Sequence, residues 1–509
     1  MCIRDRLLER VETGDPWPDQ LVRGLVTCLE KVADAKSSAQ FRPITLFSLW
    51  YRLWGSLRSR ALLSALERYA SFPAFGYLHG RSCQQMTFVI QAAVERAIRT
   101  GEDFCGVLAD IEKCFNFLPR TPIFAMAKRL GIPSNVLTGW QSFLRQMVRA
   151  FRIQGETGTF LDSDTGFPEG DSMSCLAMCI ANFSYHHYML YFQPQVTAYS
   201  FVDNLEVTAR AMTQLLQGHA AMECWADMLR LRLDQRKTSF WAVSAKTRND
   251  LKALGHAVIE SGLDLGTSMT YTASHRNAVM QLRIQSVTPL WRRLRLLRVS
   301  LWHKLLAVRM ALLPRALHDT ALIVIGKHWL DKLRSGVMRA LSFNRSGASP
   351  ALRLSILCPP LTDPWFYDAH HTVFDCQRQF QSSALLRQWW GEYAHVEPAS
   401  RTFGPFGKLT SLLADLGWHL TSDFQLWITP SFGLAFLTLD RQLLDQFLQH
   451  AWSFVISKQV RHRQTMISLH GVDRRCTTQA LTSLDKADSA LLHCIQDGTS
   501  FLELSLIHI

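Results

Sequence analysis

Two aspartates, each at the end of an apolar, strand-like run, are the residues of this sequence best suited to chemistry. Asp110 closes the run 104–110, and Asp203 follows the run 197–202 and precedes Asn204. Asp-Asn is turn chemistry, so the second run predicts a β-hairpin with a carboxylate at its tip. Taken alone, such an aspartate more often only satisfies its own backbone. Two strand-borne carboxylates on adjacent strands, however, can hold two divalent cations about 4 Å apart for in-line phosphoryl transfer.

A loop rich in glycine and proline lies between the two aspartates in the sequence. Residues 166–174 read Gly-Phe-Pro-Glu-Gly-Asp-Ser-Met-Ser and lead into an apolar helical run that extends to about Tyr191. Its glycines would let the backbone approach a nucleotide or a template closely, ahead of a helix. Mg²⁺ suits a pair of carboxylates because it completes its coordination shell with substrate phosphates and water. Each segment is a weak signal, and it is their order and spacing that indicate this chemistry.

The elements that must position these residues form an alternating pattern of strands and helices through roughly residue 270, which predicts an α+β or α/β unit. Helices are expected over 47–66, 86–99, 119–131 and 211–231. The 509 residues are 48% hydrophobic, which is enough for two to four domains or subdomains. The 12 cysteines show no ligand spacing, which argues against a zinc module and favours a reducing compartment. No apolar run is long enough to span a bilayer.

The charge of the chain favours a polyanionic partner, because the formal net charge is +13. No acidic residue occurs from Leu265 to His318, where tryptophans and leucines alternate with basic residues at helical spacing. These basic residues are Arg276, Arg283, Arg292, Arg293, Arg295, Arg298, Lys304, Arg309 and Arg315. We expect a helical segment that lays a positive face against a phosphate backbone, with an ordinary solvated basic face as the alternative.

In this order the motifs resemble those of the reverse transcriptases of non-LTR (LINE-like) retrotransposons. Residues 108–116 resemble the first palm motif of that family, residues 166–174 its template and nucleotide loop, and residues 201–204 its aromatic-x-Asp-Asp motif. The resemblance covers roughly residues 25–320. It implies an α+β right-hand polymerase fold, with fingers, palm and thumb followed by a mainly helical C-terminal region. The implied boundaries are fingers 20–105, palm with part of the fingers 106–270, basic helical thumb 271–345 and helical C-terminal region 346–503.

The resemblance also implies the roles of the catalytic residues. Asp110 and Asp203 would hold two Mg²⁺ ions, for which Mn²⁺ can substitute. The backbone carbonyl of Ile111 and, weakly, the side chain of Asn204 would complete the metal site. Lys237 would act as a general acid toward the leaving pyrophosphate.

The residues implied to contact the nucleotide and the template come from several motifs. Phe115 would act as a steric gate that excludes a 2′-hydroxyl and so selects deoxynucleotides. The implied nucleotide-binding residues are Arg42, Phe115, Gly170 and Arg81, with Lys31 as a weaker candidate. The implied template and nucleotide loop contributes Gly166, Pro168, Glu169, Asp171 and Ser174. The implied partners are an RNA template, a DNA primer or target and deoxynucleotides, with no membrane. The implied location is intracellular, in the nucleus, and the sequence leaves the oligomeric state open.

Three positions depart from the family pattern. Asn204 replaces the usual second Asp, Glu169 replaces the commoner Gln, and Asn116 replaces a frequent Asp. Asn keeps an oxygen ligand but loses a charge, so a lower metal affinity is expected. Related palm polymerases use Gly-Asp-Asn at this hairpin, so loss of activity does not follow. The alternatives are a catalytically decayed copy that only binds nucleic acid, an intron-maturase-type reverse transcriptase and, least favoured by Phe115, an RNA-directed RNA polymerase.

The two ends of the sequence are expected not to belong to the natural protein. Residues 1–6 and 504–509 can be encoded by inverted copies of one nucleotide string, which resembles the transposon end used in sequencing libraries. We therefore leave both ends out of the fold prediction and expect the natural protein to be longer in both directions.

Overall fold

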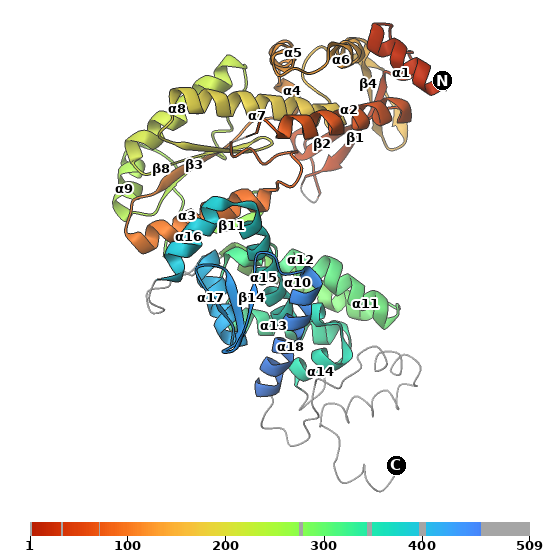
Figure 1. The fold of residues 1–509 in the computed structure, drawn as a ribbon. Helices are drawn as coiled ribbons and strands as arrows, with labels where there is room; N and C mark the ends of the chain where they lie inside the picture. The colour runs from red at the N-terminus through yellow and green to blue at the C-terminus, as the bar shows by residue number, and fades with distance from the viewer. Residues whose placement is uncertain are drawn as a thin grey trace. The chain divides into compact units, whose positions relative to one another are not determined.

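The computed structural model describes residues 3–31, 34–70, 72–273, 278–343, 349–395 and 404–459. Residues 1, 2, Arg276, the predicted C-terminal region after residue 459 and the predicted terminal segment 504–509 lie outside these ranges. The chain divides into two compact units, residues 1–86 with 103–259 and residues 87–102 with 260–509. Figure 1 colours them along the chain, and each unit is described by itself below.

The first unit contains a five-stranded sheet in the order β2-β1-β4-β5, with β6 beside β4. Strand β1 runs antiparallel to β2 and parallel to β4. The strands are β1 (Arg23–Glu30), β2 (Phe41–Leu46), β4 (Val148–Ile153), β5 (Glu156–Thr157) and β6 (Leu161–Asp162). The helices that accompany this sheet are α1 (Ile3–Thr13), α2 (Leu49–Glu67), α5 (Arg120–Arg129) and α6 (Ser134–Gln146).

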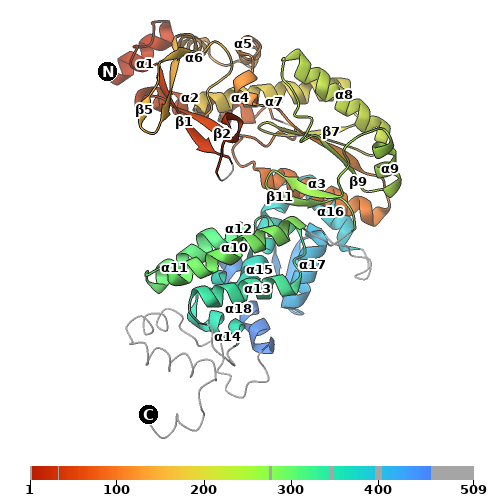
Figure 2. The ribbon, with the colours of Figure 1, turned by 180° about the vertical axis from the view of Figure 1, so that it is seen from behind.

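A second, antiparallel sheet of the same unit carries the two aspartates, in the order β7-β8-β3-β9. Its strands are β3 (Cys105–Asp110), β7 (Thr197–Phe201), β8 (Asn204–Ala209) and β9 (Ser239–Ala242). Cys105, Val107 and Ala109 alternate along β3 and are buried in the core, as the period of a strand with one buried face requires. Helices α7 (Ser172–Phe192) and α8 (Met212–Met228) pack against the sheet, and α9 (Ala245–Ala253) packs against β9 (Figure 2).

The predicted hairpin forms, but its turn lies one residue earlier than Asp-Asn chemistry suggested. Phe201 pairs with Asn204, so the turn consists of Val202 and Asp203. Asn204 is the first residue of β8 and lies opposite Asp110 on β3. Asn204 therefore pairs within the β3–β8 ladder, and this strand pairing outweighs the preference of Asn for turns. Asp203 keeps its predicted place at the tip.

The second unit is mainly helical. Its helices are α3 (Cys83–Thr100), α10 (Ala278–Leu296), α11 (Leu301–Ala307), α12 (Leu313–Ala316), α13 (Lys327–Ala340), α14 (Pro350–Leu357), α15 (Pro364–Ser382), α16 (Ala384–Ala394), α17 (Pro405–Leu416) and α18 (Arg441–Gln459), with a π-helical turn at Val308–Leu312. Its strands are β10 (Ser261–Asp264), β11 (Thr267–Thr270), β12 (His419–Leu420), β13 (Gln425–Thr429) and β14 (Phe432–Ala435). Strands β12 to β14 form a three-stranded antiparallel sheet within the otherwise helical C-terminal region.

Most of helix α3 belongs to this second unit, so the predicted end of the fingers at residue 105 does not coincide with the division of the chain. Gln91 donates from Nε2 to the carbonyl of Thr270 over 2.9 Å. The buried carboxylate of Glu95 accepts from the backbone amides of Phe406 and Gly407 over 2.9 and 2.8 Å. These two amides lie in the first turn of α17, where an acceptor satisfies otherwise unpaired donors.

The mixed α+β class that the sequence predicts is confirmed. Within the described ranges, no helix has both the length and the apolar character needed to cross a membrane.

Candidate active site

The structure brings Asp110 and Asp203 together at one end of the antiparallel sheet. Asp110 ends β3, and the backbone amide of Ile111 donates to the carbonyl of Asp203 over 2.9 Å. Asn204, directly opposite Asp110 in the ladder, donates from Nδ2 to Oδ1 of Asp203 over 3.3 Å. The side chain of Ile111 is buried. Two carboxylates and one amide therefore share this end of the sheet, as the sequence predicted; the metal-binding role of the Ile111 carbonyl stays a prediction.

Lys237 lies against the same carboxylates. Its ammonium forms an ion pair with Oδ2 of Asp110, and the backbone amide of Asp234 donates to the carbonyl of Asp110 over 2.8 Å, which ties the Lys237 loop to the strand. The hydrogen bond to Asp110 raises the pKa of Lys237. Burial raises the pKa of the Asp203 carboxyl, the neighbouring Asp110 raises it further, and Lys237 and Arg42 oppose that shift. Two clustered carboxylates need positive charge, and these cations supply part of it.

The turn that carries Asp203 is strained and held from two sides. Val202 has a φ of 58°, a left-handed conformation that is unusual for a β-branched residue. The buried Asn182 on α7 donates from Nδ2 to the carbonyl of Val202 over 3.1 Å. A Cβ on Gly76 would lie 2.7 Å from the Val202 nitrogen, so only glycine allows this close approach. Strain of this kind persists only where the surroundings enforce it, as at functional sites.

The loop predicted to contact template and nucleotide passes between the end of β3 and strand β2. A Cβ on Gly166 (φ 66°) would lie 2.3 Å from the carbonyl oxygen of Asn116. The amide of Phe167 donates to the carbonyl of Phe115 over 2.7 Å. On the other side, the amide of Thr45 donates to the carbonyl of Glu169 over 2.7 Å. The loop thus connects the predicted gate, Phe115, with the strand that carries Arg42.

Other residues of this loop face inward. Asp171 is 5% exposed, accepts from the Tyr51 hydroxyl over 3.0 Å and caps α7 by accepting from the amide of Met173. Burial raises the pKa of Asp171 to about 6. The Ser174 hydroxyl donates to the carbonyl of the buried Pro168 over 2.8 Å. The side chains of Asp171 and Ser174 therefore shape the loop from within. Gly170 has a φ of 99°, and a Cβ there would lie 2.9 Å from Cγ2 of Ile44.

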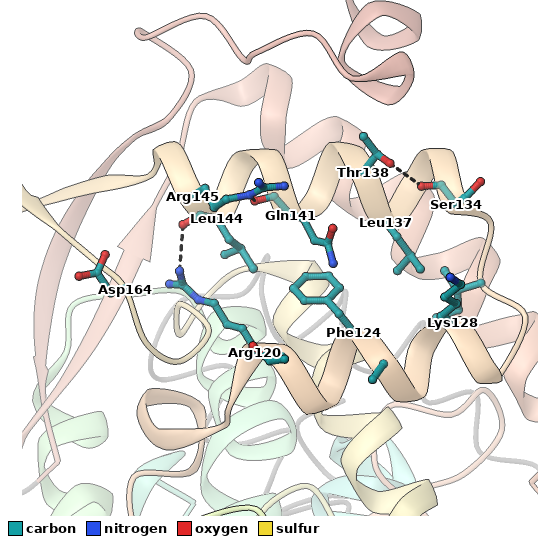
Figure 3. A pocket seen from close by; sticks show the side chains of 13 residues that line it. Arg120, Phe124, Lys128, Ser134, Leu137, Thr138, Gln141, Leu144, Arg145 and Asp164 are labelled. Atoms are coloured by element: carbon teal, nitrogen blue, oxygen red, sulfur yellow. Dashed lines mark hydrogen bonds between the residues drawn. The ribbon is translucent and has the colours of Figure 1, made fainter.

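Arg120 holds the beginning of the loop and also borders a hollow of about 800 Å³ between α5 and α6. Its guanidinium donates to the carbonyls of Gly166 (2.8 Å), Ser163 (2.6 Å) and Leu144 (3.0 Å). Figure 3 shows Arg120 reaching the carbonyl of Leu144, with Phe124 beside it on α5 and Leu137 on the facing α6. The basic residues Lys128 and Arg145 also line it, with Asp164 as the acidic one.

The predicted nucleotide-binding arginines differ in their surroundings. Arg42 on β2 is exposed, and its charge lowers the pKa of Asp203. Arg81 donates instead to the backbone carbonyls of Phe72 (2.8 Å), Ala74 (2.7 Å) and Ala70. We therefore correct its assignment: the guanidinium of Arg81 braces the loop before α3, because three carbonyls occupy its donors. Lys31, the weaker candidate, is exposed at the end of β1.

The basic segment of the second unit exposes arginines on α10, in the connection between α10 and α11, and on α12. Its exposed arginines are Arg292, Arg293, Arg295, Arg298 and Arg315, and Trp302 is 62% exposed. Trp291, in contrast, is buried and packs so closely on Gly336 that a Cβ there would lie 2.6 Å from its Nε1. Arg283 donates to the carbonyls of Gly266 and His318. Only part of the predicted basic set is therefore free to meet a phosphate backbone.

Sequence reasoning missed Arg120 and Asn182, which hold the site through backbone carbonyls. Asn182 had a signal, because it is an isolated amide in the apolar run of α7 and a buried amide needs a partner. Arg120 had none, since the carbonyls that it binds lie 24 to 46 residues away in the sequence. His186 on α7 is a packing residue, because it is buried, hydrogen-bonds to the Ser200 hydroxyl and stacks on Phe72.

The donor set fits a hard divalent cation bound together with substrate. Among the described residues, no group of three or more His, Cys, Asp and Glu side chains is gathered as a metal site would need. Asp110 and Asp203 supply two carboxylates, and Asn204 supplies an amide oxygen. Mg²⁺ typically takes one or two protein carboxylates and completes its octahedral shell with phosphates and water. The residues present therefore suit Mg²⁺ delivered with a nucleotide better than a site built from protein ligands alone.

Paired carboxylates on a sheet beside a glycine-rich loop are an arrangement that can serve nucleotidyl transfer. Residues 34–258 match the family model described as "Reverse transcriptase (RNA-dependent DNA polymerase)". The match includes Asp110, Asp203 and Lys237, and it indicates the enzyme class of RNA-directed DNA polymerases.

The solved structures to which the chain is similar include telomerases, at low identity. Apo telomerase from Candida tropicalis is 10% identical with a TM-score of 0.40, over 84% of this chain and 69% of that one. A C-terminally truncated form is 11% identical with a TM-score of 0.38, over 50% and 54%. Telomerase from Candida albicans, solved with a fragment of telomeric RNA, is 11% identical with a TM-score of 0.38, over 64% and 65%. The chain thus spans about half to two thirds of these last two, and scores this low carry no argument about function. No curated protein matches the chain.

Proposed function

We propose that this chain is the polymerase part of a non-LTR retrotransposon protein, which extends a primer 3′-hydroxyl along an RNA template. The observation that carries the proposal is the junction of β3 with the β7–β8 turn. There the Ile111 amide binds the Asp203 carbonyl and Lys237 pairs with Asp110. The family match over residues 34–258 supports the polymerase class. The retrotransposon subtype rests on the sequence resemblance, and a nuclear location follows from it.

The residues around the carboxylates divide the chemistry between them. Asp110 and Asp203, with Asn204, would hold divalent cations, and bound Mg²⁺ would stabilise the charge that develops on the primer oxygen and the α-phosphate. Lys237, whose pKa is raised by Asp110, keeps a proton that it can give to the leaving pyrophosphate. Arg42 would attract the triphosphate, and the ring of Phe115 would exclude a 2′-hydroxyl.

Nucleic acid would be held through charge on the second unit. The arginines exposed on α10 and in the connection that follows it can neutralise phosphates without reading sequence. The exposed Trp302 beside them offers an aromatic face for stacking on a base. An RNA template, a DNA primer and deoxynucleotides are the partners that this reaction requires.

Primer extension by the purified chain tests the proposal. We would supply an RNA template, a DNA primer, deoxynucleotides and either Mg²⁺ or Mn²⁺, and compare the parent with Asp203→Ala and Asn204→Asp. Extension by the parent that Asp203→Ala abolishes is the expected result. A folded parent that extends no primer, and that Asn204→Asp does not activate, would overturn it.

One alternative has a specific observation in its favour. Asn204 removes one of the usual carboxylates from a site where only Asp110 and Asp203 remain. A decayed copy that binds nucleic acid without extending a primer would fit this change. A silent parent that Asn204→Asp makes active would establish that alternative. The alternative of an intron-maturase-type enzyme is supported only by the similarity of the palm motifs.

A further inference from the structure

A side-chain hydrogen bond joins the residue after the predicted gate to the glycine-rich loop. Asn116, which directly follows Phe115, donates from Nδ2 to Oε1 of Glu169 over 3.2 Å. Both side chains are half-buried, so water competes with this bond only in part. The two residues lie 53 positions apart in the sequence, and the bond therefore locks two separate segments against each other.

Backbone contacts hold the same two segments together. The Phe167 amide donates to the Phe115 carbonyl over 2.7 Å, and Gly166 packs directly on the carbonyl of Asn116. Behind the loop, Arg120 holds the Gly166 carbonyl over 2.8 Å. These contacts fix the backbone path, and the pair of Asn116 and Glu169 is the side-chain contact that sets how closely the loop approaches residues 115 and 116.

We propose that Asn116 and Glu169 are positioning residues that hold Phe115 at the setting needed to distinguish deoxyribonucleotides from ribonucleotides. The inference rests on the proposed function, in which the Phe115 ring excludes the 2′-hydroxyl. A steric gate works only if its ring is held within about 0.5 Å of its place. Loss of the bond removes the side-chain link between the loop and the residue next to Phe115, so the ring can give way to the extra oxygen of a ribonucleotide.

The chemistry of the pair predicts an unusual pattern among variants. An ionised Glu only accepts hydrogen bonds, whereas an Asn amide both donates and accepts. Asn116→Asp therefore places two acceptors face to face and breaks the bond. Glu169→Gln keeps it, because the Gln oxygen still accepts from Asn116. In the double variant the Gln amide donates to the new carboxylate, so the bond returns with donor and acceptor exchanged.

The test compares the ratio of kcat/KM for dGTP to that for GTP in primer extension by the full chain. Asn116→Asp should lower this ratio roughly fivefold, the effect of losing one such hydrogen bond. In Glu169→Gln and in the double variant, the ratio of kcat/KM for dGTP to that for GTP should stay within about twofold of the parental ratio. A substitution that only loosened the fold would lower kcat/KM for both nucleotides together. A displaced Phe115 ring would instead raise kcat/KM for GTP relative to that for dGTP.

A matched control exists in the same unit. Asn135 donates from Nδ2 to Oε2 of Glu12 over 3.0 Å, in a contact that does not involve Phe115 or the loop. Asn135→Asp thus also places an Asp against a Glu, here one that Arg58 also binds, and it should leave the dGTP to GTP ratio unchanged. An equal shift in this control would overturn the proposal.

Binding measurements separate this inference from the proposed function. The affinities of dGTP and GTP are measured with Ca²⁺ and a chain-terminated primer on an RNA template, where no turnover is needed. If the parent fails to extend a primer, the proposed function fails, but the affinity ratio still tests the pair. An unchanged ratio in Asn116→Asp, or a double variant as impaired as Asn116→Asp, would overturn the inference by either readout.

Discussion

Lys237 pairs with Asp110 across the end of the sheet, although the lysine side chain is 62% exposed and the aspartate only 13%. The ammonium occupies a carboxylate that a divalent cation would also need under the proposed function, so lysine and metal ion would compete for Asp110. The same lysine is the proposed proton donor, and it would be available for that role only when it is released from the carboxylate.

Replacing Lys237 separates these two effects. In Lys237→Met we expect Mn²⁺ to bind several-fold more tightly, because its competitor is gone. We also expect primer extension to slow by roughly 10²-fold or more, because the general acid is lost. Electron paramagnetic resonance of bound Mn²⁺ and single-turnover extension measure the two quantities. Lys246→Met on α9, also exposed, is the control; weaker Mn²⁺ binding by Lys237→Met would contradict the competition.

Asn204→Asp should make the stability of the protein depend more strongly on metal ions. The change places a carboxylate opposite Asp110 and removes the amide that bonds Asp203. Without metal, three carboxylates repel one another and the melting temperature should fall by a few degrees. Added Mg²⁺ should then raise it more than in the parent, since binding to the folded state stabilises that state. Equal Mg²⁺ responses in the two proteins would argue against Asn204 as part of the site.

Asp171 predicts how stability changes with pH. Its folded-state pKa of about 6 lies above the ordinary value near 3.8. Between these values the folded state holds a proton that the unfolded state has released, so Asp171 makes stability fall as the pH rises from about 4 to 6. Asp171→Asn, which can still cap α7 and accept from Tyr51, should remove this contribution, on the order of 2–3 kcal/mol. Urea unfolding at several pH values compares the two proteins, and parallel pH profiles would refute the assignment.

Val202 tests the strain in the catalytic turn. Val202→Ala and Val202→Gly both remove the side chain, but only glycine adopts a φ of 58° without steric cost. We expect the glycine variant to be more stable than the alanine variant by about 1 kcal/mol. The midpoints of urea unfolding decide the order. If the alanine variant is the more stable, the left-handed conformation costs nothing here.

The basic face predicts the salt dependence of nucleic-acid binding. Each lost phosphate contact lowers the slope of log K against log salt concentration by about one. Alanine at Arg292, Arg295 and Arg298 together should therefore lower the slope by about two to three, while Lys246→Ala should not change it. A triple variant with the parental slope would leave these arginines as a solvated face only.

The sequence was most informative where the residue types of a segment and the order of the motifs along the chain indicated the same structure. The strand that ends at Asp110, the hairpin tip at Asp203 and the glycine-rich loop before α7 were predictable, because turn residues and hydrophobic periodicity mark them. Contacts that depend on tertiary structure were not predictable. Arg81 was expected to face a nucleotide and instead binds three backbone carbonyls. Trp291 and Trp302 share one helical pattern, yet only the fold decides that Trp291 is buried and Trp302 exposed.

Helix α3 has a consequence for how this protein can be divided. The region that matches the reverse transcriptase family includes α3, but the groups that satisfy Gln91 and Glu95 come from Thr270, Phe406 and Gly407. A polypeptide cut after residue 259 would keep the buried acid and lose its two amide donors, which lie more than 300 residues further along the chain. The region 34–258 therefore does not form a self-sufficient folding unit. A recombination event that transfers it would also have to transfer the helical region that follows, so we expect the two regions to be inherited together.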